Sequence, residues 1–233
     1  MAVDSRAFTV RVSESVGDVS ALLHRPRAAR WLLVLAHGAG AGMRHAFMEA
    51  VSRELAAVGV ATLRYLFPYM QQGSSRPNPP AMLIATARAA IAAAAAAAPD
   101  VPLLAGGKSL GGRMTSHAVV DPPDAASEAV ARVRGLVFFG FPLHAPGKPS
   151  ATRAAHLERV ALPMLFLQGT RDTLADLSLL RPMCATLGPR ATLHVVDTAD
   201  HSFHVLKRSG TTDADVLRDL ARTTASWAES LKP

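Results

Sequence analysis

The sequence is poor in cysteine and in metal-ligand motifs. Cys184 is its only cysteine, so no intrachain disulfide can form, and nothing indicates an oxidising compartment. We expect Cys184 to be a buried apolar residue. The nine histidines include no H-x-x-x-H or H-E-x-x-H pair on a helix. The sequence therefore implies no metal and no organic cofactor.

A targeting segment and a strongly hydrophobic run are also lacking. The opening stretch MAVDSRAFTVRV has no basic segment followed by an apolar one, so no secretory signal is predicted. The longest apolar run is the alanine tract 89–98, which is too weakly hydrophobic for a membrane span and ends at Pro99. Alanine favours helices and lets a helix lie close to a sheet, so the tract is interpreted as structural. We expect a cytoplasmic protein without membrane association.

Acidic residues are fewer than basic ones, 18 against 25, which gives a formal charge of +7. The arginines are scattered, and the densest group is the spaced trio Arg25, Arg27 and Arg30. Such dispersion does not indicate nucleic-acid binding. A positive field can attract anionic substrates, but solubility is the favoured explanation.

The chain alternates short apolar runs with helical segments. Apolar residues make up 49% of its 233 residues, enough for one large core, so a single domain over residues 1–233 is predicted. After a hairpin-like opening, strands are predicted at 31–37, 60–65, 101–107, 135–141, 163–169 and 191–197. Helices are predicted at 44–57, 81–98, 109–120, 175–187 and 213–231, with shorter ones near 124–132 and 151–159. This rhythm predicts a doubly wound α/β fold with a mostly parallel sheet and helices on both faces.

Two proline-rich connections, 67–80 and 141–153, are the long irregular segments. Both follow predicted strands, and ligands of open parallel sheets bind beyond the carboxyl ends of the strands. Tyr69 and Met70 in the first connection, His144 in the second, and Met43 are therefore candidate substrate contacts.

The stretch Gly107-Lys108-Ser109-Leu110-Gly111 matches G-x-S-x-G between a strand and a helix. In this motif the serine takes an unfavourable backbone conformation at a sharp turn, and the flanking glycines relieve clashes. The spacings of a phosphate loop and of a dinucleotide-binding loop are both absent. On these residues alone, Ser109 is either a nucleophile or the N-cap of an ordinary helix. Lys108 is expected to be solvated or salt-bridged, and a substrate contact is the less favoured alternative.

An acid and a base follow later strands. A serine nucleophile needs a general base, an orienting carboxylate and oxyanion donors. Asp172 comes just after the strand at 163–169, and His201 lies four residues after the last strand. The resulting order, Ser109, Asp172, His201, is the order expected of an α/β hydrolase.

Rival assignments remain open at this point. His204 lies three residues from His201 and is an alternative base, while Asp197 or Asp200 can replace Asp172 as the acid. Position after the strand favours the first choices. Asp200 is better suited to bonding its own loop backbone.

The small-residue stretch LAHGAGAGM, residues 35–43, is the candidate source of an oxyanion donor. The backbone N–H of Ala39, or alternatively Gly40, is predicted to form the oxyanion hole together with that of Leu110. His37 opens the loop, and a structural hydrogen-bonding role is favoured for it over a role as base.

Six blocks of the sequence together resemble the small lidless α/β hydrolases related to dienelactone hydrolase, which include the testis-expressed protein 30 group. The blocks are HGAGAGM, FPYM, GGKSLGGRM, FPLHAPGKP, QGTRD, and DHSF followed by LKRSG, between about residues 31 and 210. The resemblance implies an α/β-hydrolase fold, Ser109, Asp172 and His201 as a triad, and a pocket beside the FPLHAPGKP loop. Dienelactone hydrolase has a cysteine nucleophile where this chain has Ser109, which argues against that substrate.

Taken together, these features predict a serine hydrolase that cleaves small carboxylic esters or thioesters through an acyl-enzyme. The segment between the strands at 135 and 163 is too short for a multi-helix cap, so a shallow, open pocket is expected. The alternatives are a catalytically idle interaction protein and a triad enzyme acting as a peptidase or acyltransferase. A small-molecule partner is expected and no nucleic acid, and the oligomeric state is open, a monomer being compatible with the sequence.

Overall fold

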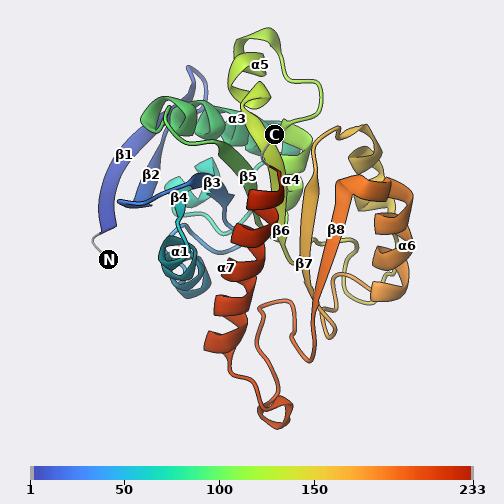
Figure 1. Ribbon diagram of the computed structural model, residues 1–233. Helices are drawn as coiled ribbons and strands as arrows, with labels where there is room; N and C mark the ends of the chain where they lie inside the picture. The colour runs from blue at the N-terminus through green and yellow to red at the C-terminus, as the bar shows by residue number, and fades with distance from the viewer. Residues whose placement is uncertain (1–2, 232–233) are drawn as a thin grey trace.

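Eight strands form one sheet in the computed structural model, which describes residues 3–231 (Figure 1). The strand order is β1-β2-β4-β3-β5-β6-β7-β8. The first two strands pair antiparallel as the expected hairpin, β2 is antiparallel to β4, and the pairs from β4 to β8 are parallel. The strands are β1 Val3–Ser13, β2 Gly17–Pro26, β3 Trp31–Ala36, β4 Val60–Tyr65, β5 Leu103–Lys108, β6 Val133–Phe139, β7 Met164–Gly169 and β8 Ala191–Val196.

The prediction of a mostly parallel α/β sheet is confirmed, because each of the six predicted runs forms one of the strands β3 to β8. Every residue of β3, β4 and β7 is buried, as continuous apolar runs require when both sheet faces are covered. The prediction of a single domain over residues 1–233 stays a prediction, and residues 1, 2, 232 and 233 lie outside the described part.

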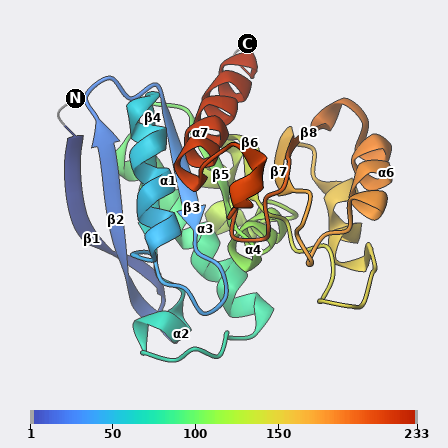
Figure 2. The ribbon, with the colours of Figure 1, turned by 90° about the horizontal axis from the view of Figure 1, so that it is seen from below.

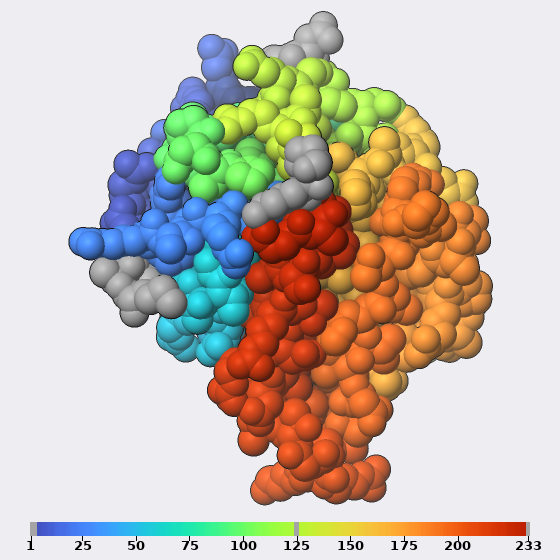
Figure 3. Space-filling model, viewed as in Figure 1, coloured from blue at the N-terminus to red at the C-terminus, as the bar shows by residue number. Residues whose placement is uncertain are grey.

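Helices cover both faces of the sheet. The α-helices are α1 Ala46–Ala57, α2 Pro68–Gln71, α3 Pro80–Ala97, α4 Leu110–Ala118, α5 Asp124–Ala131, α6 Leu177–Leu187 and α7 Asp213–Ser230. Helices α1 and α7 pack side by side on one face with their own buried cluster, whereas α3, α4 and α6 contribute to the cluster on the other face. Figure 3 shows α7 along the middle of its face with α1 beside it.

The short helical segment predicted near 151–159 is present as a 3₁₀ helix, η1 (Thr152–Arg159). One expectation needs correction, because the connection 67–80 is not wholly irregular and contains a short helix, α2. Pro68 stands at the first position of α2, where its missing N–H costs no hydrogen bond. Two further 3₁₀ helices are η2 (Gly188–Arg190) and η3 (Lys207–Ser209).

The alanine tract lies on α3, as expected of a structural helix. Ala87, Ala90 and Ala94 are fully buried in the core cluster. By length and hydropathy alone, with a mean of 1.5 over the helix, α3 is the one helix of residues 3–231 that could cross a membrane. In the fold it packs against α4, α5 and β1. Cys184 is buried on α6, as predicted.

The carboxyl ends of β3, β5, β7 and β8 meet at one end of the sheet. Residue Ala36 of β3 is paired with Gly107 of β5, so the loop after β3 begins beside Ser109. The connection from β8 to α7 projects from the lower end of the molecule (Figures 1 and 3). The view from below in Figure 2 looks toward this end, with β1 and β2 at one side and α6 at the other. The topology therefore brings the predicted site residues to one place.

Candidate active site

Ser109 sits on a strained turn between β5 and α4. Its φ of 51° and ψ of −120° lie outside the ordinary conformations of a non-glycine residue. Although Ser109 precedes the first residue of α4, its side chain makes no capping hydrogen bond. The interpretation of Ser109 as an ordinary helix cap therefore does not fit the structure.

The two glycines that flank Ser109 in the motif have no room for a side chain. A Cβ at Gly107 would lie 2.4 Å from the carbonyl oxygen of Ala36, and one at Gly111 would lie 2.5 Å from that of His37. Both obstacles are backbone atoms, which cannot rotate away. These close approaches fix the turn against β3 and its loop.

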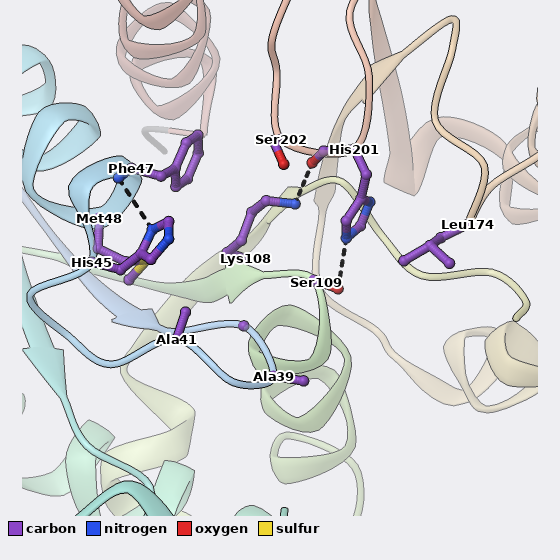
Figure 4. Close-up of a pocket in the computed structure, with 11 residues that line it drawn as sticks. Ala39, Ala41, His45, Phe47, Met48, Lys108, Ser109, Leu174, His201 and Ser202 are labelled. Carbon is purple, nitrogen blue, oxygen red and sulfur yellow. Dashed lines mark hydrogen bonds between the residues drawn. The ribbon is translucent and has the colours of Figure 1, made fainter. Parts of the chain in front are cut away.

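Three predicted side chains come together beyond the sheet end. Ser109 Oγ donates to His201 Nε2 over 2.9 Å (Figure 4). In the tautomer that serves both bonds, His201 Nδ1–H donates to Asp172 Oδ2 over 2.7 Å. The Asp172 side chain is 1% exposed. Its Oδ1 also accepts from the backbone N–H of Leu174 at 2.8 Å, and Gln168 Nε2 donates to its Oδ2. These bonds hold the carboxylate in one orientation toward the imidazole.

The rival acids and base take other partners. His204 is exposed and pairs with Asp213 at 2.8 Å, and this carboxylate raises the pKa of His204. Asp200 Oδ1 accepts from two backbone N–H groups of its own loop at 2.8 and 3.0 Å, as expected. Asp197 accepts from a threonine hydroxyl at 3.2 Å. None of these three contacts Ser109 or His201 through a hydrogen bond in the described part of the chain.

A second serine–histidine pair lies elsewhere. Ser116 Oγ on α4 bonds His156 Nε2 on η1 over 2.8 Å, and the imidazoles of His156 and His117 stack with centroids 3.4 Å apart. Ser116 is fully buried and its hydroxyl also bonds the carbonyl of Arg113. Among the side chains that the structure describes, no carboxylate bonds to His156, so this pair does not have the arrangement found at Ser109.

Two backbone N–H groups are candidates for binding an oxyanion. Ala39 lines the cavity beside Ser109, and Leu110 is the first residue of α4, at the positive end of the helix dipole. Neither amide donates a hydrogen bond to another group of the described residues. Gly40, the alternative donor, has a φ of +69° and is exposed. The arrangement is compatible with the predicted pairing of Ala39 with Leu110.

His37 has structural partners, as expected. Its Nε2 accepts from the backbone N–H of Phe67 at 3.0 Å, and its Nδ1 donates to the carbonyl of Gly38 at 2.8 Å. The residue is fully buried, and this burial lowers its pKa to about 4. A neutral His37 thus ties the loop after β3 to the segment after β4.

A cavity of about 310 Å³ opens beside Ser109 and His201. Its walls are mainly small or apolar: Ala39, Ala41, Phe47, Met48 and Leu174 (Figure 4). Polar side chains reach it from His45, Lys108 and Ser202. Among the residues whose side chains are described, no group of three or more His, Cys, Asp or Glu residues is arranged to hold a metal.

The four predicted substrate contacts, Met43, Tyr69, Met70 and His144, are not among the residues lining this cavity. Met43, Tyr69 and His144 are buried. The methyl group of Met70 packs behind the loop after β3, and His144 binds the backbone N–H of Asp176 at 2.9 Å and the carbonyl of Ala145 at 2.9 Å. The two proline-rich connections therefore support the loops that form the cavity wall.

The residues that line the cavity are only weakly indicated by the sequence. Phe47 and Met48 lie in the first turn of α1, directly after the small-residue loop, and Leu174 lies two residues after Asp172. The backbone N–H of His144 donates to the carbonyl of Leu174 at 2.9 Å. Proximity in sequence to the small-residue loop or to Asp172 was thus a better guide to the wall than membership of a long proline-rich connection.

The strained serine turn, the Ser–His–Asp hydrogen bonds and the parallel sheet with this strand order define an α/β hydrolase fold. Residues 29–229 match the alpha/beta hydrolase domain family. The chain belongs to this family.

Solved structures share the fold over nearly the whole chain. A dienelactone hydrolase from Anabaena variabilis is 19% identical and superposes with a TM-score of 0.72, covering 98% of each chain. An α/β serine hydrolase homologue from Coxiella burnetii is 18% identical with a TM-score of 0.72, covering 94% of this chain and 96% of its own. A lidless α/β serine hydrolase from Xanthomonas campestris is 18% identical with a TM-score of 0.70, covering 97% and 96%. The cap-free α/β hydrolase fold is therefore shared, at identities too low to carry over a substrate.

Proposed function

We propose that this protein is a serine hydrolase that cleaves small carboxylic esters or thioesters through an acyl-enzyme intermediate. The observation that carries the proposal is the hydrogen-bonded series Ser109 Oγ to His201 Nε2, 2.9 Å, and His201 Nδ1 to Asp172 Oδ2, 2.7 Å. Membership of the α/β hydrolase domain family supports it.

In the proposed mechanism Ser109 Oγ attacks the substrate carbonyl while His201 Nε2 accepts its proton. Asp172 stabilises the imidazolium, and the N–H groups of Ala39 and Leu110 bind the oxyanion of the tetrahedral intermediate. Collapse expels the alcohol or thiol, which takes the proton from His201. Water then attacks the acyl-enzyme with His201 again as base, which releases the acid and restores Ser109.

The cavity supports a small substrate. A volume of about 310 Å³ is at the lower end of the range for small-molecule pockets. Between β6 and β7 the chain forms only η1 and irregular segments, which leaves the cavity without a helical cap. Short or flexible acyl groups fit this space better than long lipids.

Finer assignments extend the same proposal. The six sequence blocks support placing the chain with the testis-expressed protein 30-like hydrolases, and the lone buried Cys184 is compatible with a cytoplasmic location. The proposed partner is a small ester or thioester, without cofactor, nucleic acid or membrane.

The alternative function is that of a catalytically idle interaction protein. It is disfavoured because all three triad side chains are present and are hydrogen-bonded to one another.

Kinetics with p-nitrophenyl esters of increasing acyl length test this function. We expect turnover that falls as the acyl chain lengthens and that is lost in Ser109→Ala, with Ser15→Ala on the β1–β2 turn as the control. Thioester and peptide substrates run beside the esters separate the esterase from a peptidase. Unchanged ester turnover in Ser109→Ala would show that the proposal is wrong.

A further inference from the structure

Lys108 is the motif residue that the proposed mechanism leaves unused. It was expected to be solvated or salt-bridged, and the structure corrects this: the side chain is largely enclosed and forms no salt bridge within the described residues. Its Nζ instead donates a hydrogen bond of 2.5 Å to the backbone carbonyl of His201 (Figure 4). One residue of the serine turn thus holds the backbone of the histidine.

Two aromatic rings complete the surroundings of the ammonium group. Lys108 Nζ lies 5.9 Å from the ring centroid of Phe47 on α1 and 5.6 Å from that of Phe203 in the loop after β8. The two rings stack on each other with centroids 5.8 Å apart. Cation–π attraction favours a charged lysine here, so Lys108 links β5, α1 and the His201 loop.

The ammonium group also lies behind the Asp172–His201 pair. A Cβ built on Gly140, which follows β6 with a φ of +70°, would lie 3.1 Å from Lys108 Nζ, 3.3 Å from His201 Nδ1 and 3.4 Å from Asp172 Oδ2. All three polar atoms therefore converge on the same glycine. Lys108 is thus close to the imidazole of His201 as well as to its backbone.

We propose that Lys108 is a positioning residue for His201: its Nζ holds the backbone carbonyl of His201, and this bond fixes the loop that sets the distance from the imidazole to Ser109. The inference rests on the proposed serine hydrolase function.

The protonation of Lys108 itself fits this role. Burial lowers its pKa to about 8, while Asp172 and Asp200 act to raise it. The ammonium form therefore predominates at pH 7, where an ester hydrolase with a histidine base works.

Three variants separate the hydrogen bond from the charge. Lys108→Met removes both, Lys108→Gln keeps an N–H donor without charge, and Lys108→Arg keeps both. Lys207→Met, at an exposed position of the same loop, is the matched control. Thermal unfolding checks that each variant is folded. If Lys108→Met does not fold, the comparison of Lys108→Gln with Lys108→Arg tests the inference.

For Lys108→Met we expect kcat to fall about tenfold to a hundredfold from misplacement of the base, with KM within about twofold. Lys108→Gln should lose less kcat than Lys108→Met, because its amide can still donate to the His201 carbonyl. Lys108→Arg, which keeps both the donor and the charge, should restore kcat toward that of the wild type.

Equal losses of kcat in Lys108→Met, Lys108→Gln and Lys108→Arg would overturn the inference, because a lysine that only fills space gives no rescue by variants that keep the donor. The same holds if Lys108→Met matches Lys207→Met in all constants. Labelling by a fluorophosphonate distinguishes a failure of the hydrolase function from a failure of the role of Lys108. An unlabelled wild type contradicts the hydrolase function. A labelled, active wild type with unaffected Lys108 variants contradicts only the role of Lys108.

Discussion

The carboxylate of Asp172 illustrates how much a single residue depends on its neighbours. Its Oδ2 accepts from His201 and Gln168, and its Oδ1 accepts from the N–H of Leu174. The side chain is 1% exposed, and both of its oxygens have hydrogen-bond partners, which hold the carboxylate in one orientation toward the imidazole. Asp197 has one threonine hydroxyl as side-chain partner and lies at the surface.

Replacing Asp172 by Asn should therefore lower kcat by roughly 10³ to 10⁴, because the amide favours the wrong histidine tautomer, with KM little changed. Asp197→Asn is the matched control and should stay within about twofold of the wild type. Steady-state kinetics on a short p-nitrophenyl ester measure both. If Asp197→Asn were inactive and Asp172→Asn active, the acid would be misassigned.

Gly140 is a second residue whose identity follows from its contacts. Its φ of +70° disfavours a side chain, and a Cβ would touch Lys108 Nζ, His201 Nδ1 and Asp172 Oδ2 at 3.1 to 3.4 Å. Gly140→Ala should cost about 1 to 2 kcal/mol of stability from the left-handed backbone and lower kcat more than tenfold by shifting the imidazole. Urea unfolding and ester kinetics together test this, and a variant with normal kcat would contradict the crowding argument.

At the scale of elements, the turn from β5 to α4 is packed directly on β3. The carbonyl oxygens of Ala36 and His37 lie 2.4 and 2.5 Å from where a Cβ would be at Gly107 and Gly111. The backbones of the two elements are in direct contact here. The glycines of the motif therefore permit this close packing and also allow the strained turn at Ser109. The pattern G-x-S-x-G thus reports a tertiary contact between β5, α4 and β3.

Gly107→Ala and Gly111→Ala should accordingly destabilise the fold by about 2 kcal/mol or more, as overpacked sites do. Gly42→Ala is the control, since a Cβ there meets only the side chains of Leu66 and Met70 at 3.4 and 3.6 Å. Chemical denaturation of the three variants measures the difference. Equal stability of Gly107→Ala and Gly42→Ala would refute the packing argument.

The strands and helices were predictable from the sequence where the burial of an element is visible in its own residues. Strands β3 to β8 are visible as apolar runs because both their faces are covered, and Ser109, Asp172 and His201 follow strand ends whose relative place the topology dictates. The direction of loop side chains was not predictable: Tyr69 and His144 turn into the protein because their rings and nitrogens find partners there. The enclosure of Lys108 likewise depends on Phe47 and Phe203, which are distant in sequence.

For the whole molecule, buried neutral histidines make stability depend on pH. Burial lowers the pKa of His37 to about 4, and burial, with His117 and Arg113 nearby, lowers that of His156 to about 4. In the unfolded chain these histidines have the ordinary histidine pKa of about 6.5. Between about pH 6.5 and pH 4 the unfolded chain therefore binds more protons than the native state. Their stabilising effect is complete above about pH 6.5 and is lost as the pH falls toward 4.

The free energy of unfolding should therefore decrease steadily between about pH 6.5 and 4. Urea denaturation at several pH values measures it, and His37→Gln should flatten the dependence because it removes one titrating group. An identical slope in His37→Gln would contradict the assignment of a neutral, buried His37.

The central claim, that Ser109 is the nucleophile activated by His201, is tested most directly by locating the adduct of a fluorophosphonate by mass spectrometry. The account predicts one phosphonate on the peptide that contains Ser109 in the wild type, and strongly slowed labelling in His201→Ala. Labelling at another serine, such as Ser116 or Ser202, or unlabelled Ser109 in the folded wild-type protein, would contradict it.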